Sequence, residues 1–345
     1  MGQKPEIRTM VDEIGRYGAA VFLVTSEEYY AEGFRPGDIV TVTINGKKFI
    51  VPQGTAYSDV DSHELILLKI ALEDRMILAV NNEPGFAEKN GIRRGDEVRI
   101  KRKKKGGYLK EYRLRSVLMS GDRADYESDE AFANFRTVKA GNILPGRLYR
   151  GFSPINPSDN RNLIADRLLS QTGVRTAINL DNEDPEARSR YPGYAESFYA
   201  GLRVVPVRMS FSPEEESFPE SIRAAVTAAA ENPAPLYIHC RYSRDRTGLL
   251  CAILEALCGA SPEEIRLDYM LSYENIHHLR RYSEKWEFQA VQHVDRVLSD
   301  LLGIGDFGRT TGEMLCEKTK EMLTLRCGIP DDTIQKLVEN LCRKD

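Results

Sequence analysis

At 345 residues, 41% of them hydrophobic, the chain is long enough for two domains with cores of their own, which excludes a disordered tail. Its formal net charge of −4 excludes a whole-molecule attraction to nucleic acid or anionic membranes. No stretch approaches the roughly 18 consecutive apolar residues of a membrane span, the first residues lack the apolar run of a signal peptide, and Glu6 does not fit a myristoylation motif.

Residues 1–118 are expected to form a small β-barrel domain. Within them, residues 33–40 and 91–98 echo each other, as Gly-Phe-Arg-Pro-Gly-Asp-Ile-Val and Gly-Ile-Arg-Arg-Gly-Asp-Glu-Val. In both copies a turn that contains glycine feeds a strand. Many short strands joined by turns are typical of a small barrel.

Two hairpins are expected in this first domain. In the first, Val, Thr and Ile alternate over residues 40–44, and an Asn45-Gly46 turn leads back into residues 49–51. In the second, the chain passes through Lys104-Lys105-Gly106-Gly107 into a strand expected at residues 108–114. The two hairpins together supply the strands of the barrel.

Three short segments carry a resemblance to a known family: Tyr57-Ser58-Asp59-Val60, Ala79-Val80-Asn81-Asn82 and Phe86-Ala87-Glu88. They resemble the small C-terminal β-barrel of the S-adenosylmethionine hydroxide adenosyltransferases, over about residues 33–101. The other domain of those enzymes, which holds much of the nucleoside site, has no counterpart here. A PDZ-like assignment competes for residues 91–98. We expect a barrel that binds an unknown ligand or only packs against its neighbour, since fold alone does not imply function.

The run Lys101-Arg102-Lys103-Lys104-Lys105 suggests an anionic partner, either nucleic acid or lipid. We expect it at the tip of a hairpin, where charges are usually solvated. No aromatic residues alternate with it to stack on bases. A basic patch of this kind is only an electrostatic footprint, so no nucleic-acid partner is expected.

The chain becomes polar and acidic around residues 119–133, which we expect to be a linker. Residues 134–345 are expected to form an α/β domain with a central sheet flanked by helices. A capping box at Ser261-Pro262-Glu263-Glu264 opens one helix. Further elements are expected as strands at residues 148–151, 175–180, 202–207 and 235–238, and as helices at residues 222–230 and 334–341.

The ten residues from His239 to Gly248 carry the chemistry, as His-Cys-Arg-Tyr-Ser-Arg-Asp-Arg-Thr-Gly. The strand at residues 235–238 runs into them, and a stretch with helical apolar spacing follows. The short spacing between Cys240 and Arg246 allows a tight loop whose N–H groups converge on a tetrahedral phosphate. Arg246 can hold two phosphate oxygens through its planar fork. The same field, with the helix that Thr247-Gly248 opens, is expected to lower the thiol pKa of Cys240.

Cys240 is therefore the expected nucleophile. Thr247 can donate its hydroxyl to the thiolate and stabilise it again when a phosphocysteine intermediate is hydrolysed. The alternatives are a cysteine that only fills the core and a phosphate-binding domain without turnover. The remaining loop residues are expected to contact substrate, and these are His239, Arg241, Tyr242, Ser243, Arg244 and Gly248.

These residues resemble the HCx5R(S/T)G signature of the protein tyrosine phosphatase superfamily. Arg244-Asp245-Arg246 is similar to the Lys-Asp-Arg sequence of the atypical bacterial phosphatases that resemble both tyrosine and phosphoinositide phosphatases. Asp268-Tyr269-Met270-Leu271-Ser272 resembles a downstream segment of that group. Many relatives carry glycine where this chain has Ser243, and often arginine where it has Asp181. The resemblance implies a tyrosine-phosphatase-like domain that hydrolyses phosphomonoesters.

A general acid must protonate the leaving oxygen, yet residues 185–239 contain no aspartate. The resemblance implies that the aspartate inside the loop, Asp245, is the acid. The alternative is that Asp245 pairs with Arg244 or caps the helix. The rival acids are in an acidic turn, and these are Glu214, Glu215 and Glu216.

Phosphotyrosine is the expected substrate, with phosphoinositides or inositol phosphates as rivals because Arg241 and Arg244 add positive charge near the nucleophile. Other classes stay open: a phosphate-recognition domain without turnover, and an interaction protein that works through its barrel. Arg136 and Arg150 either approach the active site or form a salt-bridged scaffold.

The six cysteines are sparse and show no metal-ligand spacing, so a reducing cytoplasm is expected and neither a metal nor another cofactor. Cys251 and Cys258 are expected to pack in the core. His277-His278 is expected to be a surface or packing feature.

Overall fold

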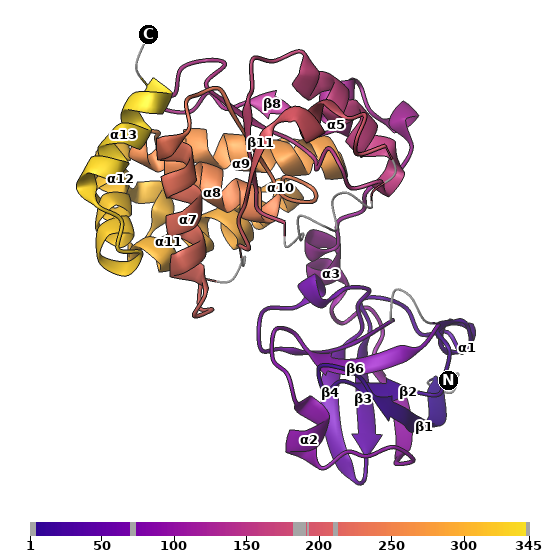
Figure 1. Ribbon diagram of the computed structural model, residues 1–345. Helices are drawn as coiled ribbons and strands as arrows, with labels where there is room; N and C mark the ends of the chain where they lie inside the picture. Colours follow the sequence, from indigo (N-terminus) through magenta and orange to yellow (C-terminus); the bar gives the residue numbers. More distant parts are fainter. Residues whose placement is uncertain (1–4, 70–73, 182–190, 192, 210–212, 343–345) are drawn as a thin grey trace. The chain divides into compact units, whose positions relative to one another are not determined.

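The computed structural model describes residues 5–69, 74–181, 191, 193–209 and 213–342 (Figure 1). Its contacts divide the chain into two compact units, Met1–Leu118 and Met119–Asp345. The buried apolar side chains of each unit form hydrophobic clusters that the other unit does not share. Each unit is therefore described by itself.

The first unit is built on one seven-stranded sheet in the order β4-β3-β7-β1-β2-β6-β5. The end strands β4 and β5 meet through an isolated bridge between Gln53 and Leu67, and the N–H of Gly54 donates to the Leu67 carbonyl at 3.0 Å. The sheet is thus nearly closed, which confirms the expected small barrel. Its strands are β1 (Glu6–Ile14), β2 (Ala20–Phe22), β3 (Ile39–Ile44), β4 (Lys47–Pro52), β5 (Leu65–Lys69), β6 (Met76–Val80) and β7 (Glu97–Lys104).

The first expected hairpin is confirmed as β3 and β4. Val40, Val42 and Ile44 alternate into the core, which is the pattern of a strand with one buried face. Asn45 and Gly46 turn the chain at φ values of 49° and 78°, both in the left-handed region that a two-residue hairpin turn requires. Local turn chemistry therefore fixes the register of this pair.

The echo between residues 33–40 and 91–98 is one turn used twice. Asp38 and Asp96 each accept a hydrogen bond from the backbone N–H three residues earlier, at 3.2 and 2.7 Å. Gly37 precedes the first aspartate with a φ of 89°, a conformation that favours glycine. The two turns lead into β3 and β7, which pair with each other antiparallel. The repeated sequence thus starts two neighbouring strands.

The second expected hairpin is wrong, because residues 109–115 form a helix, α3 (Leu109–Arg115). β7 already has β3 on one side and β1 on the other, so no edge remains for a further strand. Tyr108 and Tyr112 stand one helical turn apart, and the N–H of Tyr112 donates to the Tyr108 carbonyl at 2.9 Å. The other helical segments of this unit are α1 (Ser26–Ala31), the 3₁₀ turn η1 (Tyr57–Asp59) and α2 (Phe86–Asn90).

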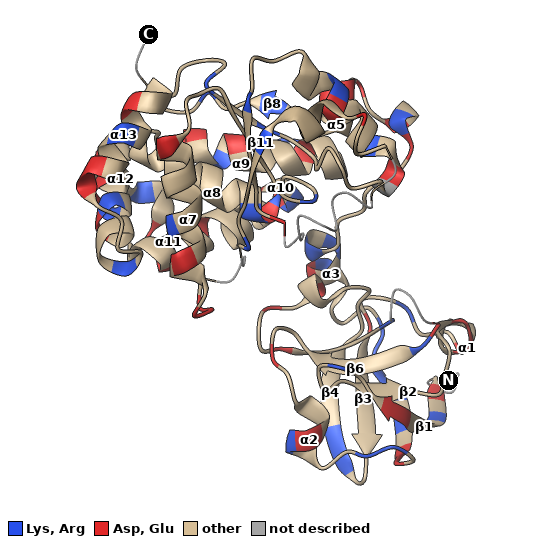
Figure 2. Cartoon of the chain, in the orientation of Figure 1, with Lys and Arg blue, Asp and Glu red and all other residues tan. Residues whose placement is uncertain are grey.

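The basic run does not stand at a hairpin tip, since most of it lies within β7. Lys101 is 3.6 Å from Glu6, and Arg102 is 3.6 Å from Asp38. Figure 2 shows basic and acidic residues interspersed along the unit. Part of the charge of the run is therefore compensated within the barrel.

The second unit is built on a five-stranded sheet in the order β11-β10-β12-β9-β8. β9, β12, β10 and β11 are parallel, and only the edge strand β8 is antiparallel. The carboxyl ends of the four parallel strands therefore share one edge of the sheet. The strands are β8 (Arg136–Thr137), β9 (Leu148–Arg150), β10 (Thr176–Asn179), β11 (Arg203–Pro206) and β12 (Leu236–His239).

Helices flank this sheet, as expected for the α/β class (Figure 1). α8 (Asp245–Leu257) is the central one, since every residue from Thr247 to Leu257 is buried, Cys251 among them. The predicted capping box is confirmed at α9 (Pro262–His277), where the N–H of Ser261 donates to Glu264 Oε2 at 2.8 Å. The other α-helices are α4 (Asp129–Phe132), α5 (Arg161–Ser170), α7 (Phe218–Glu231), α10 (Glu284–Ala290), α11 (Arg296–Leu302), α12 (Gly312–Glu321) and α13 (Asp331–Cys342). The 3₁₀ segments are η2 (Arg123–Asp125), η3 (Ser158–Asn160), η4 (Phe198–Gly201) and η6 (Phe307–Arg309). Two π-helical segments, η5 (Val291–Asp295) and η7 (Met322–Arg326), continue α10 and α12.

Residues 119–133, expected to be a linker, lie within the second unit and contact its core. The guanidinium of the buried Arg161 lies over the rings of Tyr126 and Phe132, 4.9 and 4.0 Å from their centroids. It donates to the carbonyls of Phe132 and Ser120 and, at 2.8 Å, to the Tyr126 hydroxyl. Arg161 therefore ties this segment to the rest of the second unit.

Asp38 should contribute measurably to the stability of the first unit, because it is only 2% exposed and also accepts from the N–H of Gly106 at 2.7 Å. We expect Asp38→Ala to lower the free energy of unfolding by about 1–3 kcal/mol, the cost of leaving partly buried donors without their acceptor. Urea unfolding followed by circular dichroism measures this. The fluorescence of Trp286, the only tryptophan, reports the second unit and should not shift. Asp96→Ala, in the more exposed copy of the turn, should cost less, and an equal loss would contradict the argument.

Candidate active site

Cys240 directly follows β12, and α8 begins five residues later at Asp245. Because β12 lies between β10 and β9, the loop stands at the carboxyl edge of a parallel sheet, where ligands bind in open α/β folds. The predicted order of strand, loop and helix is confirmed, although the helix starts two residues earlier than expected. Cys240 is 4% exposed. Its thiol therefore lies at the base of the loop beside the N-terminus of α8.

His239 is buried and contacts the backbone of Cys240. Its Nδ1 lies 3.3 Å from the Cys240 carbonyl, which can only accept, so Nδ1 carries the proton. Its Nε2 lies 2.8 Å from the hydroxyl of Tyr199, which donates to it in the neutral ring. Both ring nitrogens are thus engaged with protein groups, which suits a residue that shapes the loop.

Ser243 stands at the position where relatives carry glycine, and it has a φ of 53°. This left-handed conformation costs a residue with a side chain roughly 1–2 kcal/mol. The surroundings offset that cost, because the Ser243 carbonyl accepts from Arg150 Nη2 at 2.6 Å, Asn134 Nδ2 at 3.1 Å and Ser272 Oγ at 3.3 Å. The departure from glycine therefore leaves the loop in the conformation that glycine would favour.

Arg150 and Arg136 form a buried ion-pair cluster with Asp268. Arg150 Nη1 lies 2.6 Å and Arg136 Nε 2.8 Å from the carboxylate oxygens of Asp268. Burial by itself raises the pKa of Asp268, but the two guanidiniums outweigh it and hold that pKa well below its ordinary value. The scaffold alternative is thus correct for Arg136, while Arg150 both forms the scaffold and contacts the loop.

Arg246 is directed toward the end of β10. Its Nη1 donates to the Leu180 carbonyl at 3.0 Å, and its Nη2 donates to Asp181 Oδ1 at 2.9 Å. Burial lowers the pKa of Arg246, but the charges of Cys240 and Asp181 outweigh it and raise that pKa above its usual value. These contacts leave its Nε–H and the second hydrogen of each Nη group for a phosphate. Asp181 and Leu180 therefore fix the orientation of the Arg246 guanidinium.

Asp245 is paired with its neighbour in the loop. Its two carboxylate oxygens accept from Arg244 Nε at 2.9 Å and Nη2 at 3.0 Å. Arg244 Nη1 also lies 2.7 Å from His277 Nε2, which must present its lone pair there. Burial raises the pKa of Asp245, but the Arg244 charge outweighs it, so the pKa is lowered. The role of Asp245 as an acid stays a prediction, and it requires Arg244 to release the carboxyl.

The rival acids Glu214, Glu215 and Glu216 are exposed in the turn before α7. Ser212, at the start of the same predicted loop, lies outside the described residues. The carbonyl of Glu215 accepts from the N–H of Phe218 at 3.0 Å, which helps to start the helix. Their exposure to solvent favours a solvated acidic turn with no catalytic role over the role of general acid.

Thr247 and Gly248 open the buried part of α8. Within the part of the chain that the structure describes, the buried Thr247 hydroxyl has no hydrogen-bond partner, so it is available to a thiolate. At Gly248, an added Cβ would come within 2.5 Å of the Tyr269 ring. Glycine is therefore required here for the helix to pack against α9.

Arg241 and Tyr242 lie at the outer part of the loop. The Tyr242 ring packs edge-on against Phe152 with 5.5 Å between centroids. The exposed Arg241 places its guanidinium carbon 5.2 Å from the centre of the Tyr242 ring. This cation–π contact keeps a positive charge at the rim of the site.

No local pattern points to Asn134, Ser272 or His277 as partners of the loop. Asn134, for example, reaches Ser243 across 109 residues of sequence. Asp181 could have been predicted to lie near the loop. It comes shortly after β10, which is parallel to β12, and the carboxyl ends of parallel strands share one edge of the sheet.

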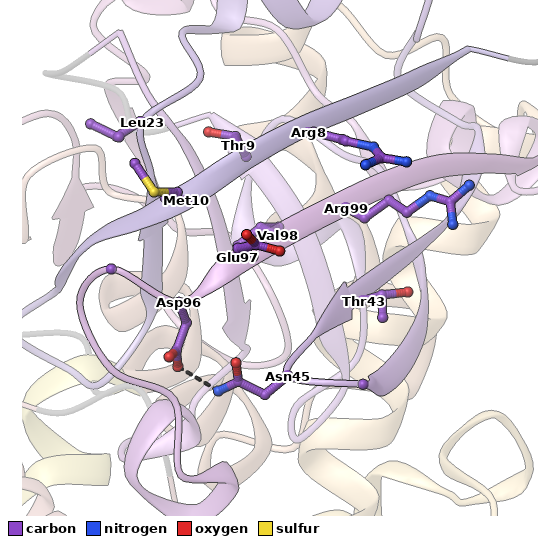
Figure 3. Close-up of a pocket in the computed structure, with 12 residues that line it drawn as sticks. Arg8, Thr9, Met10, Leu23, Thr43, Asn45, Asp96, Glu97, Val98 and Arg99 are labelled. Carbon is purple, nitrogen blue, oxygen red and sulfur yellow. Dashed lines mark hydrogen bonds between the residues drawn. The ribbon is translucent and has the colours of Figure 1, made fainter.

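The first unit offers an open groove over β1, β7 and the β3–β4 turn (Figure 3). Arg8 and Arg99 extend from neighbouring strands, and Asp96 accepts from Asn45 Nδ2 at 2.7 Å. Arg99 is itself paired with Glu6 at 2.8 Å. The groove therefore presents both signs of charge and selects no single class of ligand.

Within the described residues, no group of three or more His, Cys, Asp or Glu side chains could hold a metal ion. No helix in the same part of the chain is long and apolar enough to cross a membrane.

Solved structures include several similar proteins. An uncharacterized conserved protein from Thermotoga maritima matches at 20% identity and a TM-score of 0.27, over 29% of this chain and 37% of that one. A conserved hypothetical protein from Thermus thermophilus matches at 20% identity and a TM-score of 0.21, over 29% and 36%. The core catalytic domain of the PP-IP phosphatase SIW14 from S. cerevisiae matches at 16% identity and a TM-score of 0.28, over 49% and 94%. Scores this low carry no argument about function.

No curated protein matches the chain. The resemblance of the first unit to the adenosyltransferase barrel stays a prediction. The family model described as "Tyrosine phosphatase family" matches residues 132–343, which contain the whole of the loop from His239 to Gly248. Because this match covers more than half of the sequence, the chain belongs to the tyrosine phosphatase family.

Proposed function

We propose that the second unit is a cysteine-dependent phosphomonoesterase that acts through a phosphocysteine intermediate. The observation that carries this proposal is the placement of Cys240 in the short loop after the parallel strand β12 and of Arg246 in the first turn of α8, the helix that follows the loop. Anions are stabilised at helix N-termini and in loops whose N–H groups converge. A phosphate in this loop would meet the thiolate, the N–H groups and the guanidinium together.

In the first step the Cys240 thiolate attacks phosphorus. The S–P bond forms, the P–O bond to the ester oxygen breaks, and that oxygen takes a proton from the general acid. In the second step water attacks phosphorus and passes a proton to the carboxylate that the general acid became in the first step, the S–P bond breaks, and its electron pair returns to sulfur. The Thr247 hydroxyl, buried without a partner among the described residues, can donate to the thiolate each time it forms.

Phosphotyrosine is the main proposed substrate. Arg244, a candidate for binding a second phosphate, is bound to Asp245 and His277. Arg241 supplies an exposed guanidinium at the rim. This arrangement suits a substrate with one phosphate. The alternative substrate, a phosphoinositide or inositol polyphosphate, would bind more tightly if Arg244 released Asp245 and paired with a second phosphate.

The alternative of another class is a phosphate-binding domain without turnover, which would bind oxyanions and hydrolyse nothing. An interaction protein that works through residues 1–118 should bind its ligand with that unit alone. A thiolate nucleophile persists in reducing surroundings, so the expected cytoplasmic setting remains part of the proposal.

Cys240→Ser should abolish the hydrolysis of p-nitrophenyl phosphate, because the hydroxyl is a far weaker nucleophile than a thiolate at neutral pH. Steady-state kinetics measure this. Cys251→Ser, a change at a buried cysteine of α8, the helix after the loop, is the matched control and should keep activity. Full hydrolysis by Cys240→Ser would contradict the covalent route, and a wild-type protein that binds but never hydrolyses would favour the non-catalytic alternative.

Asp245→Asn should slow alkyl phosphates by about 10²–10⁴-fold, the usual contribution of a general acid. Activated aryl phosphates, which leave without a proton, should change little. Because the pKa of Asp245 is lowered, little of its carboxyl is protonated near neutral pH. The protonated fraction, which is the form that can act as an acid, increases as pH falls. Wild-type turnover of alkyl phosphates should therefore rise toward acidic pH, and the variant should lose this rise. Equal losses for both substrates would make Asp245 structural and leave Glu214, Glu215 and Glu216 as candidates.

Arg241→Ala should reduce turnover of inositol phosphates more than that of phosphotyrosine peptides, because a ligand with several phosphates gains more from a second cation. We expect inositol-based phosphates to be accepted by the wild-type protein. A panel of phosphopeptides, phosphoinositides and inositol phosphates measures both. Good phosphopeptide turnover with no activity on any inositol phosphate would overturn this expectation.

A further inference from the structure

Three successive backbone carbonyls of the catalytic loop, those of residues 241–243, accept hydrogen bonds from buried donors of the same unit. The Arg241 carbonyl accepts from the N–H of Ser153 at 3.1 Å. The Tyr242 carbonyl accepts from Asn134 Nδ2 at 3.2 Å. The Ser243 carbonyl accepts from the same nitrogen at 3.1 Å and from Arg150 Nη2 at 2.6 Å. The carbonyls therefore face the buried donors.

This arrangement determines where the next N–H groups point. In a planar trans peptide the C=O and the N–H that follows it point in opposite directions. The N–H groups of Tyr242, Ser243 and Arg244 therefore point away from the buried donors. Ser243 is left-handed at a φ of 53°, and Arg244 is right-handed at a φ of −101° and a ψ of −73°. Successive residues of opposite hand bring their N–H groups together into an anion-binding concavity.

We propose that Asn134 and Arg150 are positioning residues for phosphate binding, which act by holding these carbonyls and so directing the loop N–H groups at the oxyanion. The inference rests on the proposed function, because it assigns the oxyanion to this loop. Neither residue touches the substrate. Their effect is on the affinity of the loop for tetrahedral and trigonal oxyanions.

The orientation of the Asn134 amide is fixed by its neighbours. Its Oδ1 accepts from Arg136 Nη1 at 2.7 Å and from Asn275 Nδ2 at 3.1 Å. Because two donors meet the oxygen, the nitrogen must face the two loop carbonyls. The residue is fully buried and has a φ of 47°, which asparagine and aspartate tolerate better than most side chains.

Asn134→Asp is therefore a selective test. The substitution keeps the size, the backbone preference and an oxygen for Arg136, so the fold has every reason to persist. It replaces only the nitrogen, and places an acceptor against the Tyr242 and Ser243 carbonyls. Arg150 is harder to replace, because its loss would leave Asp268 with one cation fewer.

The experiment compares the full chain with Asn134→Asp and with a matched control, Asn142→Asp. Asn142 Nδ2 donates at 3.0 Å to the carbonyl of Cys258, which follows the far end of α8. We expect vanadate inhibition of the Asn134 variant to weaken by about tenfold or more, the effect of losing two buried hydrogen bonds. KM should rise with it, while Asn142→Asp should stay near the wild type. Trp286 fluorescence on heating checks that each variant is folded.

Wild-type vanadate affinity in a folded Asn134→Asp variant would overturn the inference, and so would equal losses in the two variants. If Asn134→Asp does not fold, Arg150→Lys answers the question, since it keeps a cation beside Asp268 but lacks the second N–H arm. It should weaken vanadate inhibition, and unchanged inhibition would refute the role of Arg150. A wild-type protein that neither binds vanadate nor hydrolyses phosphates would instead refute the proposed function.

Discussion

The geometry of the catalytic loop depends on the carboxylate of Asp268. It lies between the guanidiniums of Arg150 and Arg136, whose charges would be costly to bury without it. With that charge in place, Arg150 can stay fully buried and donate to the carbonyl of Ser243. The left-handed turn at Ser243, and with it the direction of the loop N–H groups, follows from this chain of contacts. Contacts that are distant from Cys240 in sequence thus shape the loop that we propose to bind phosphate.

Local patterns predicted the strand, the loop and the helix around Cys240, because each depends on residues that are neighbours in sequence. The Asn45-Gly46 turn and the Ser261 capping box were predictable for the same reason. Asn134 and Ser272 were not, since their contact with Ser243 exists only after distant elements have packed. The helix α3 was mistaken for a strand because the sequence does not show that both edges of β7 are occupied.

The first unit shows how a repeated sequence can have a structural cause. Asp38 and Asp96 close the same kind of turn at the start of β3 and β7, and those strands lie side by side in the sheet. The repeat therefore accounts for the geometry of the barrel and does not by itself identify a ligand. The basic run does not identify a ligand either, since Arg102 pairs with Asp38 inside the unit.

The contacts of Arg161 place residues 120–132 in the catalytic unit, although the polar and acidic composition of this segment suggests a linker. It is a buried cation whose partners include backbone carbonyls and aromatic faces, and several of these come from residues 120–132. A fragment that starts at residue 134 would remove them and leave the buried guanidinium with fewer partners, among them Asp159 at 4.0 Å. Any autonomous phosphatase module cut from this chain must therefore keep the acidic segment, which makes residue 119 its natural first residue.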